Sequence, residues 1–239
     1  MSTFMGKATI MDPDFGTEAA LDRLLGAAVP HLAFDGWSPA LLKAAAADSG
    51  LAPGLVAALV PRGAVDLALA AHRQGDRQMI AALAATDLSA LRFRERIAHA
   101  VRLRLELAGP REGLRRSAAF FAMPAHAAEG AALIWGTADA IWTALGDTSR
   151  DINWYSKRVT LSAVYSSTVL YWLGDDSPGA AATWEFLDRR IENVMAFEKA
   201  KAGFNASALG KALAGPLSFL GRVRAPEPAR DMPGHTDPR

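Results

Sequence analysis

Apolar residues recur at spacings of three and four along almost the whole chain after Thr17, and the strict alternation of half-buried strands is hard to find. In TEAALDRLLGAAV, for example, Thr17 is a predicted N-cap, and the apolar stripe behind it consists of Leu21, Leu24, Leu25 and Ala28. The pattern therefore predicts an all-α protein without a β-sheet.

Two of the predicted helices are separated by a very short break, in SPALLKAAAADSGLAPGLVAALV at residues 38–60. Ser38 before Pro39 marks the start of the first helix. Gly50 and Pro53 mark its end and the start of the next. This spacing predicts a helix-turn-helix.

The second of these helices lacks the chemistry of a DNA reader. Recognition helices normally carry basic and amide side chains for phosphates and base edges, whereas PGLVAALV at 53–60 has no charged, amide or hydroxyl side chain. Residues 38–61 hold only Lys43 and Asp48 as charged groups. We expect no nucleic-acid partner, because this segment has only Lys43 to neutralise phosphate groups.

The composition changes near the C-terminus, where residues 199–224 contain five basic side chains and no acidic one. The apolar residues that can share one helical face are Phe204, Leu209, Leu213, Leu217 and Leu220, with Lys201 and Lys211 elsewhere around the helix. Such a segment suits a helix on a membrane surface, with its apolar face at the headgroup boundary and its lysines on anionic lipid. Packing against the rest of the protein is the alternative.

These patterns divide the chain into five parts. They are a flexible N-terminus at 1–16, a helix-turn-helix-like part at 17–72, a helical bundle at 73–202, an amphipathic membrane-associating helix at 203–224 and a disordered, Pro-rich tail at 225–239. No apolar run approaches the roughly 18 residues needed to span a bilayer.

Composition and motifs narrow the chemistry. The 239 residues are 51% hydrophobic with a formal net charge of +1, which suits a globular protein, and the absence of cysteine excludes disulfides and thiolate metal sites. Five scattered histidines form no metal-binding motif, and nucleotide-binding and serine-hydrolase signatures are missing. We expect no metal, no cofactor and no catalytic role.

A polar connector between two apolar helical runs carries two neighbouring aromatics, in GDTSRDINWYSKR at residues 146–158. Trp154 and Tyr155 fall in the first turn after the connector. Adjacent helix positions point about 100° apart, so we expect at least one ring to reach the surface. An exposed aromatic with charged neighbours is typical of a protein-binding hot spot; burial between helices is the alternative.

The same connector, together with DDSP at 175–178 and TWEFLDRRI at 183–191, resembles the coenzyme Q biosynthesis protein nine family. The resemblance extends over roughly Gly36 to Phe197 and includes LVPRGAVDL at 59–67, where Val60 replaces the phenylalanine of the family motif. It implies a fold similar to TetR-type regulators, with a vestigial helix-turn-helix and a C-terminal amphipathic helix.

The resemblance also implies a function. Members of this family are accessory lipid-binding proteins of ubiquinone synthesis, whose partner is the di-iron demethoxyubiquinone hydroxylase. The family's partner surface matches Trp154 and Tyr155 here, and the neighbours that follow by the same matching are Asp151, Arg158, Leu145 and Asp147. A ligand-sensing regulator of the TetR type is the alternative function, and whether two copies form a homodimer stays open.

The implied cargo is an isoprenoid quinone intermediate or a phospholipid, held in an apolar cavity. Its expected lining consists of Leu161, Val164, Tyr165, Thr168, Trp172 and Trp184, although these residues fit an ordinary packed core equally well. The N-terminal sequence and the Ala- and Arg-rich composition indicate a bacterial version. We therefore expect a cytoplasmic protein, peripheral on the inner membrane, where eukaryotic relatives would face the mitochondrial matrix.

Overall fold

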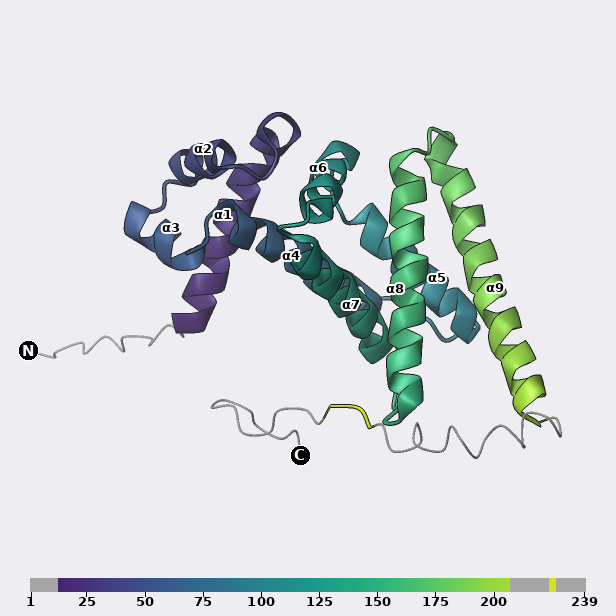
Figure 1. Cartoon of the computed structure of the whole chain (residues 1–239). Helices are drawn as coiled ribbons and strands as arrows, with labels where there is room; N and C mark the ends of the chain where they lie inside the picture. The colour runs from purple at the N-terminus through teal and green to yellow at the C-terminus, as the bar shows by residue number, and fades with distance from the viewer. Residues whose placement is uncertain (1–12, 207–223, 227–239) are drawn as a thin grey trace, which may run out of the picture. The chain divides into compact units, whose positions relative to one another are not determined.

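The computed structural model describes residues 13–206 and 224–226, and within that part it contains helices and no strand (Figure 1). The helices are α1 (Pro13–Asp35), α2 (Pro39–Ser49), α3 (Pro53–Leu59), α4 (Ala64–Ala84), α5 (Phe93–Glu106), α6 (Arg111–Ala122), α7 (Ala127–Ala144), α8 (Ile152–Leu173), the short 3-10 helix η1 (Pro178–Ala180) and α9 (Ala181–Ala206). The all-α prediction is confirmed.

The predicted membrane segment falls largely outside the described residues. The part outside includes Leu209, Lys211, Leu213, Leu217 and Leu220. Lys201 and Phe204 belong to the last part of α9, where only the backbone is described. The membrane role of this segment therefore stays a prediction.

The chain forms two compact units, while the predicted functional division at residue 72 stays a prediction. The first unit comprises residues 1–87 and 100–134, and the second comprises residues 88–99 and 135–239. Helices α5 and α7 each contribute residues to both units. A continuous helical pattern gives no sign of such a boundary.

The core of the first unit is built mainly by α1, α2 and α4. Leu24, Leu41 and Leu67 are completely buried there. Trp37, just before α2, donates from its indole Nε1 to the hydroxyl of Ser117 in α6 at 2.8 Å. Helix α1 begins four residues ahead of Thr17, at Pro13; proline is favoured in a first helical turn because its missing N–H has no intrahelical partner there.

The predicted helix-turn-helix is present as α2 and α3. Ser38 caps α2 by accepting the N–H of Leu41 at 3.2 Å, and Gly50 ends it in the left-handed region at φ 63°. Proline occupies the first position of both helices. The local signals in the sequence therefore placed both helix starts correctly.

In the second unit, α8 and α9 run side by side in opposite directions (Figure 1). Tyr171 of α8 stacks on Phe186 of α9 with ring centroids 4.5 Å apart. Asp175, in the turn between them, accepts the N–H and the hydroxyl of Thr183 and so caps the start of α9. These contacts join the C-terminal end of α8 to the start of α9, and the aromatic pair lies at the opposite end of α8.

Candidate functional site

The connector between α7 and α8 is a tight, capped turn. Gly146 ends α7 in the left-handed region at φ 80°, and its N–H bonds back to the carbonyl of Thr143 at 3.0 Å. Asp151 then caps α8 by accepting the N–H of Asn153 at 3.0 Å. The glycine and the aspartate of the motif therefore fix where one helix ends and the next begins.

Asp147 and Arg158 form the buried base of this turn, with each side chain only 3% exposed. The carboxylate of Asp147 accepts hydrogen bonds from Lys157 Nζ at 2.7 Å and from Arg158 Nη1 at 3.2 Å. Arg158 Nε also donates to Asp139 at 2.5 Å. Burial raises the pKa of Asp147, but hydrogen bonds from Lys157, Ser149 and Arg158 outweigh it and lower the pKa to about 2. Both side chains of the pair are hydrogen-bonded to charged partners, so they stabilise the turn.

The aromatic pair stands on this base. The guanidinium of Arg158 lies 3.9 Å from the ring centre of Trp154, a cation–π contact. Trp154 and Tyr155 meet edge to face at 4.7 Å, and Trp135 of α7 lies 5.8 Å from the first ring and 6.4 Å from the second. All three rings are half-buried, so each keeps part of its surface accessible. We call these three rings the aromatic corner.

The six predicted partner residues thus gather at one end of α8 but differ in position. Trp154 and Tyr155 are half-buried, Asp151 is exposed, and Leu145 is half-buried at the end of α7. Asp147 and Arg158 are buried, and Arg158 lies against the ring of Trp154. The structure gives the first four an accessible surface and the last two a supporting position; their role in partner binding stays a prediction.

Sequence reasoning did not assign Trp135, Asp139 or Lys157 to the site. Trp135 and Trp142 lie seven residues apart, two helical turns, on the side of α7 that meets α8. Trp142 donates to the carbonyl of Lys157 at 3.1 Å, and Lys157 Nζ lies 5.0 Å from its ring centre. The spacing of the two tryptophans is the sequence feature that could have indicated this face of α7 as part of the site.

The predicted lipid-lining residues form the inward face of α8. The five on this helix are buried: Leu161, Val164, Tyr165, Thr168 and Trp172. Thr168 satisfies its buried hydroxyl by donating to the carbonyl of Val164 at 2.7 Å. Trp184 on α9 is half-buried and donates to Gly179 at 2.9 Å. These positions fit both a cavity wall and a packed core, so the lipid role also stays a prediction.

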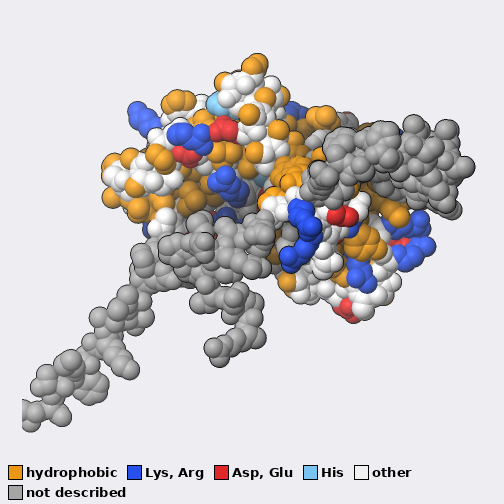
Figure 2. Space-filling model, turned by 60° about the horizontal axis from the view of Figure 1, so that its bottom comes forward, with side chains coloured by type: hydrophobic (Ala, Val, Ile, Leu, Met, Phe, Trp, Pro, Cys, Tyr) orange, Lys and Arg blue, Asp and Glu red, His pale blue; other side chains and the backbone are white. Residues whose placement is uncertain are grey.

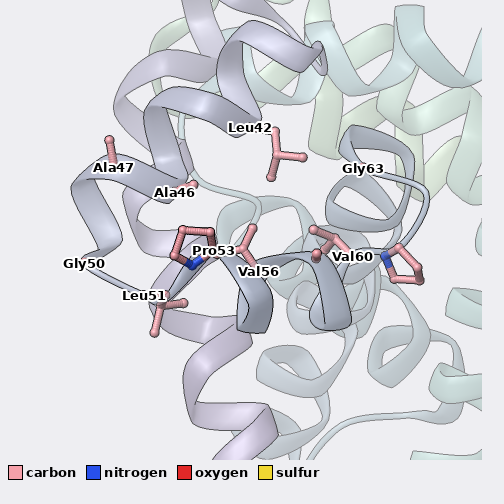
Figure 3. Close-up of a pocket in the computed structure, with 11 residues that line it drawn as sticks. Leu42, Ala46, Ala47, Gly50, Leu51, Pro53, Val56, Val60 and Gly63 are labelled. Carbon is pink, nitrogen blue, oxygen red and sulfur yellow. The ribbon is translucent and has the colours of Figure 1, made fainter.

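A first pocket, of about 590 Å³, lies in the helix-turn-helix-like part (Figure 3). Leu42, Val56 and Val60 point into it from α2 and α3, and every residue that lines it is apolar or glycine. Leu55 of α3 is 40% exposed. The helix at the DNA-reading position thus presents apolar surface, in line with the expectation of no nucleic-acid partner, which stays a prediction.

A second pocket, of about 580 Å³, is lined by α1, α4, the end of α5 and α6. Its polar part includes Arg104, whose Nε donates to Asp76 at 2.7 Å and whose side chain is 3% exposed. Burial, followed by the nearby Arg104 cation, lowers the pKa of His72 to about 4, so this imidazole is neutral at physiological pH. Gly75 makes room for the arginine, because a Cβ there would lie 2.7 Å from Arg104 Nη1.

Large apolar side chains reach the surface outside both pockets. On α8, Val159 is 58% and Leu170 is 68% exposed. Figure 2 shows hydrophobic side chains among Lys and Arg side chains on the face that it presents. Contiguous exposed apolar surface is typical of contact sites for proteins or membranes.

Within residues 13–206 and 224–226, no three His, Asp or Glu side chains are grouped so as to hold a metal ion. Over the same part of the chain, no single helix is long and apolar enough to cross a membrane, although α3 and α4 together reach that apolar length across a 67° bend.

The arrangement of the helices defines the class of the protein. It is similar to the crystal structure of a TetR transcriptional regulator from Nitrosomonas europaea, with a TM-score of 0.60 and 20% identity, over 73% of this chain and 97% of that one. At this identity the similarity shows the fold alone, so this is an all-α protein with a TetR-regulator-like fold.

Residues 127–198, which include the aromatic corner, match the family model described as COQ9, so this region of the chain belongs to that family. It is 33% identical over 185 residues to the ubiquinone biosynthesis protein COQ9, mitochondrial, of Drosophila melanogaster, covering 74% of this chain and 56% of the fly protein. It is 29% identical over 167 residues to the probable ubiquinone biosynthesis protein coq9, mitochondrial, of Dictyostelium discoideum, covering 67% and 54%. The chain thus spans little more than half the length of these relatives.

Proposed function

We propose that this chain is a non-catalytic, lipid-binding accessory protein of ubiquinone biosynthesis. It takes polyprenylated quinone intermediates from the membrane and presents them to the di-iron hydroxylase of the pathway. The names of the relatives support the pathway. The observation that carries the proposal is the aromatic corner, three half-buried rings on a base of buried charges.

The corner has the properties of a binding hot spot. Aromatic rings with part of their surface accessible supply large contact areas at low cost in side-chain entropy. The cation–π contact of Arg158 fixes the ring of Trp154 before a partner arrives. A partner that packs on these rings therefore has little ordering to carry out, which favours binding.

The cargo argument rests on solubility. A polyprenylated ring is almost insoluble in water, since each Å² of exposed apolar surface costs roughly 25 cal/mol. A protein that carries it needs an apolar site of matching size, for which we propose the inward face of α8. The basic amphipathic segment at 203–224 would bring that site to anionic lipid on the cytoplasmic face of the inner membrane.

Trp154→Ala combined with Tyr155→Ala tests the proposed partner surface. We expect capture of the purified hydroxylase to weaken at least roughly tenfold, because two hot-spot rings are lost. Tyr171→Ala is the matched control: it removes a 39% exposed ring from the far end of the same helix and should leave capture unchanged.

Wild-type capture by the double variant, at an unchanged thermal midpoint, contradicts the proposed surface. If the double variant loses its fold, Tyr155→Ala alone carries the test, because it keeps the stacking of Arg158 on Trp154.

A further inference from the structure

A short piece of the C-terminal region, Arg224–Pro226, lies against the start of α8, and we call it the strap. It is drawn in yellow in Figure 1, beside the N-terminal end of that helix. The N–H of Ala225 donates to the carbonyl of Arg150 at 3.0 Å. The hydroxyl of Tyr155 donates to the carbonyl of Arg224 at 3.2 Å. Two hydrogen bonds, one on each side of a peptide unit, thus hold this segment against Arg150 and against Tyr155, one of the three rings of the aromatic corner.

The local sequence suits this role. Ala225 precedes Pro226, and the proline ring restricts the residue before it to extended backbone. The N–H of Ala225 and the carbonyl of Arg224 are therefore set in direction before docking. This restriction lowers the entropy that is lost when the segment is ordered.

The strap is held weakly enough to be displaced. Among the described residues, two hydrogen bonds act against the cost of ordering the strap, and the side chains of Arg224 and Pro226 are exposed. A segment held in this way exchanges between docked and released states. It also occupies the one polar group of Tyr155, which a partner at the aromatic corner would meet.

We propose that the strap is an intramolecular ligand of the aromatic corner and that it competes with the partner protein for this surface. This inference rests on the proposed function, because it assumes that the partner binds at Trp154 and Tyr155. Only the fraction of molecules with a released strap is competent to bind, so the apparent affinity of the whole chain lies below that of the free surface.

Docking of the strap is tested first, without any partner. In the chain of residues 1–239 labelled with ¹⁵N, the amide of Ala225 should exchange with solvent more slowly than in a free peptide of residues 220–230. Tyr155→Phe removes one of the two hydrogen bonds and keeps the ring, so it should speed this exchange. Exchange of the Ala225 amide at the free-peptide rate in the wild-type chain would overturn the inference.

Competition is tested with Ala225→Pro, which removes the N–H that bonds to Arg150, and with Ala225→Ser as the control that keeps it. We expect Ala225→Pro to bind the hydroxylase roughly two- to tenfold more tightly than the wild type, as one lost hydrogen bond predicts, and Ala225→Ser to match the wild type. Equal affinity of all three chains contradicts the inference alone. Absence of binding by all three, wild type included, contradicts the proposed function and with it the inference.

Discussion

At the scale of single residues, Arg158 is the side chain on which the aromatic corner depends. It is buried, pairs with two aspartates and stacks on Trp154. Removing one partner of a buried ion pair leaves the other charge without compensation, so Arg158→Ala should lower the free energy of unfolding by about 3–5 kcal/mol.

Urea unfolding measures this effect, and Arg189→Ala is the control. Arg189 pairs with Glu185 at 3.8 Å on the surface, with the two side chains 57% and 75% exposed. Its loss should cost less than about 1 kcal/mol. Equal effects of the two variants would mean that the buried charges do not support the site.

Asp147 makes the stability of the fold depend on pH. Its pKa falls from 3.8 to about 2 on folding, so the folded state favours the charged form. This stabilisation, about 2 kcal/mol, is fully present above the unfolded pKa and is lost as the pH falls from roughly 4 to 2. Asp147→Asn should flatten the curve of unfolding free energy against pH in this range.

Part of the acid dependence should survive in Asp147→Asn. Hydrogen bonds from Ser177 and Thr183 also lower the pKa of Asp175, and burial does not offset them. A slope between pH 4 and 2 as steep as that of the wild type would show that Asp147 is not the group responsible.

The sequence motif identified the residues of the corner but not their positions. Trp154 and Asp147 lie in one short motif, yet the first reaches the surface and the second is buried under it. Both positions involve α7: Trp135 lies 5.8 Å from the ring of Trp154, and Arg158, which pairs with Asp147, also pairs with Asp139. Contacts between separate helices of this kind do not follow from local spacing.

At the scale of helices, close packing of α7 against α6 depends on Gly130. A Cβ there would lie 2.8 Å from Cβ of Phe121 and 3.1 Å from its carbonyl oxygen, atoms that the backbone fixes. Gly130→Ala should therefore lower the free energy of unfolding by about 1–3 kcal/mol.

Gly136→Ala, in the same helix, is the matched control. A Cβ at Gly136 meets nothing within 4 Å, so the change should stabilise by about 0.4–1 kcal/mol through the unfolded state. Thermal unfolding of both variants checks the pair, and the same sign for both would refute the packing argument.

Helix boundaries differ in how far the sequence predicts them. Ser38 and Gly50 act through their own backbone neighbours, and the ends of α2 appear where they indicate. Helices α5 and α7 run unbroken across the boundary of the two units. No local signal marks that boundary, because it is set by which residues pack together and not by where the helical pattern stops.

At the scale of the whole molecule, the periodicity of apolar residues was enough to predict an all-α fold, since each helix buries one stripe. The fold is similar to that of a TetR transcriptional regulator, but α3 offers apolar surface, whereas binding to nucleic acid needs basic side chains for the phosphates. This contrast favours the accessory function over the alternative of a TetR-type regulator, because function depends on the site and not on the fold.

The central claim is that the protein carries a lipid, either an isoprenoid quinone intermediate or a phospholipid, and organic extraction of the freshly purified chain followed by mass spectrometry tests it most directly. We expect a polyprenylated quinone intermediate or a phospholipid to be recovered with the wild-type chain and to be lost when the protein is unfolded and refolded without lipid. Wild-type protein that yields no lipid, and that binds no added quinone afterwards, would contradict the account.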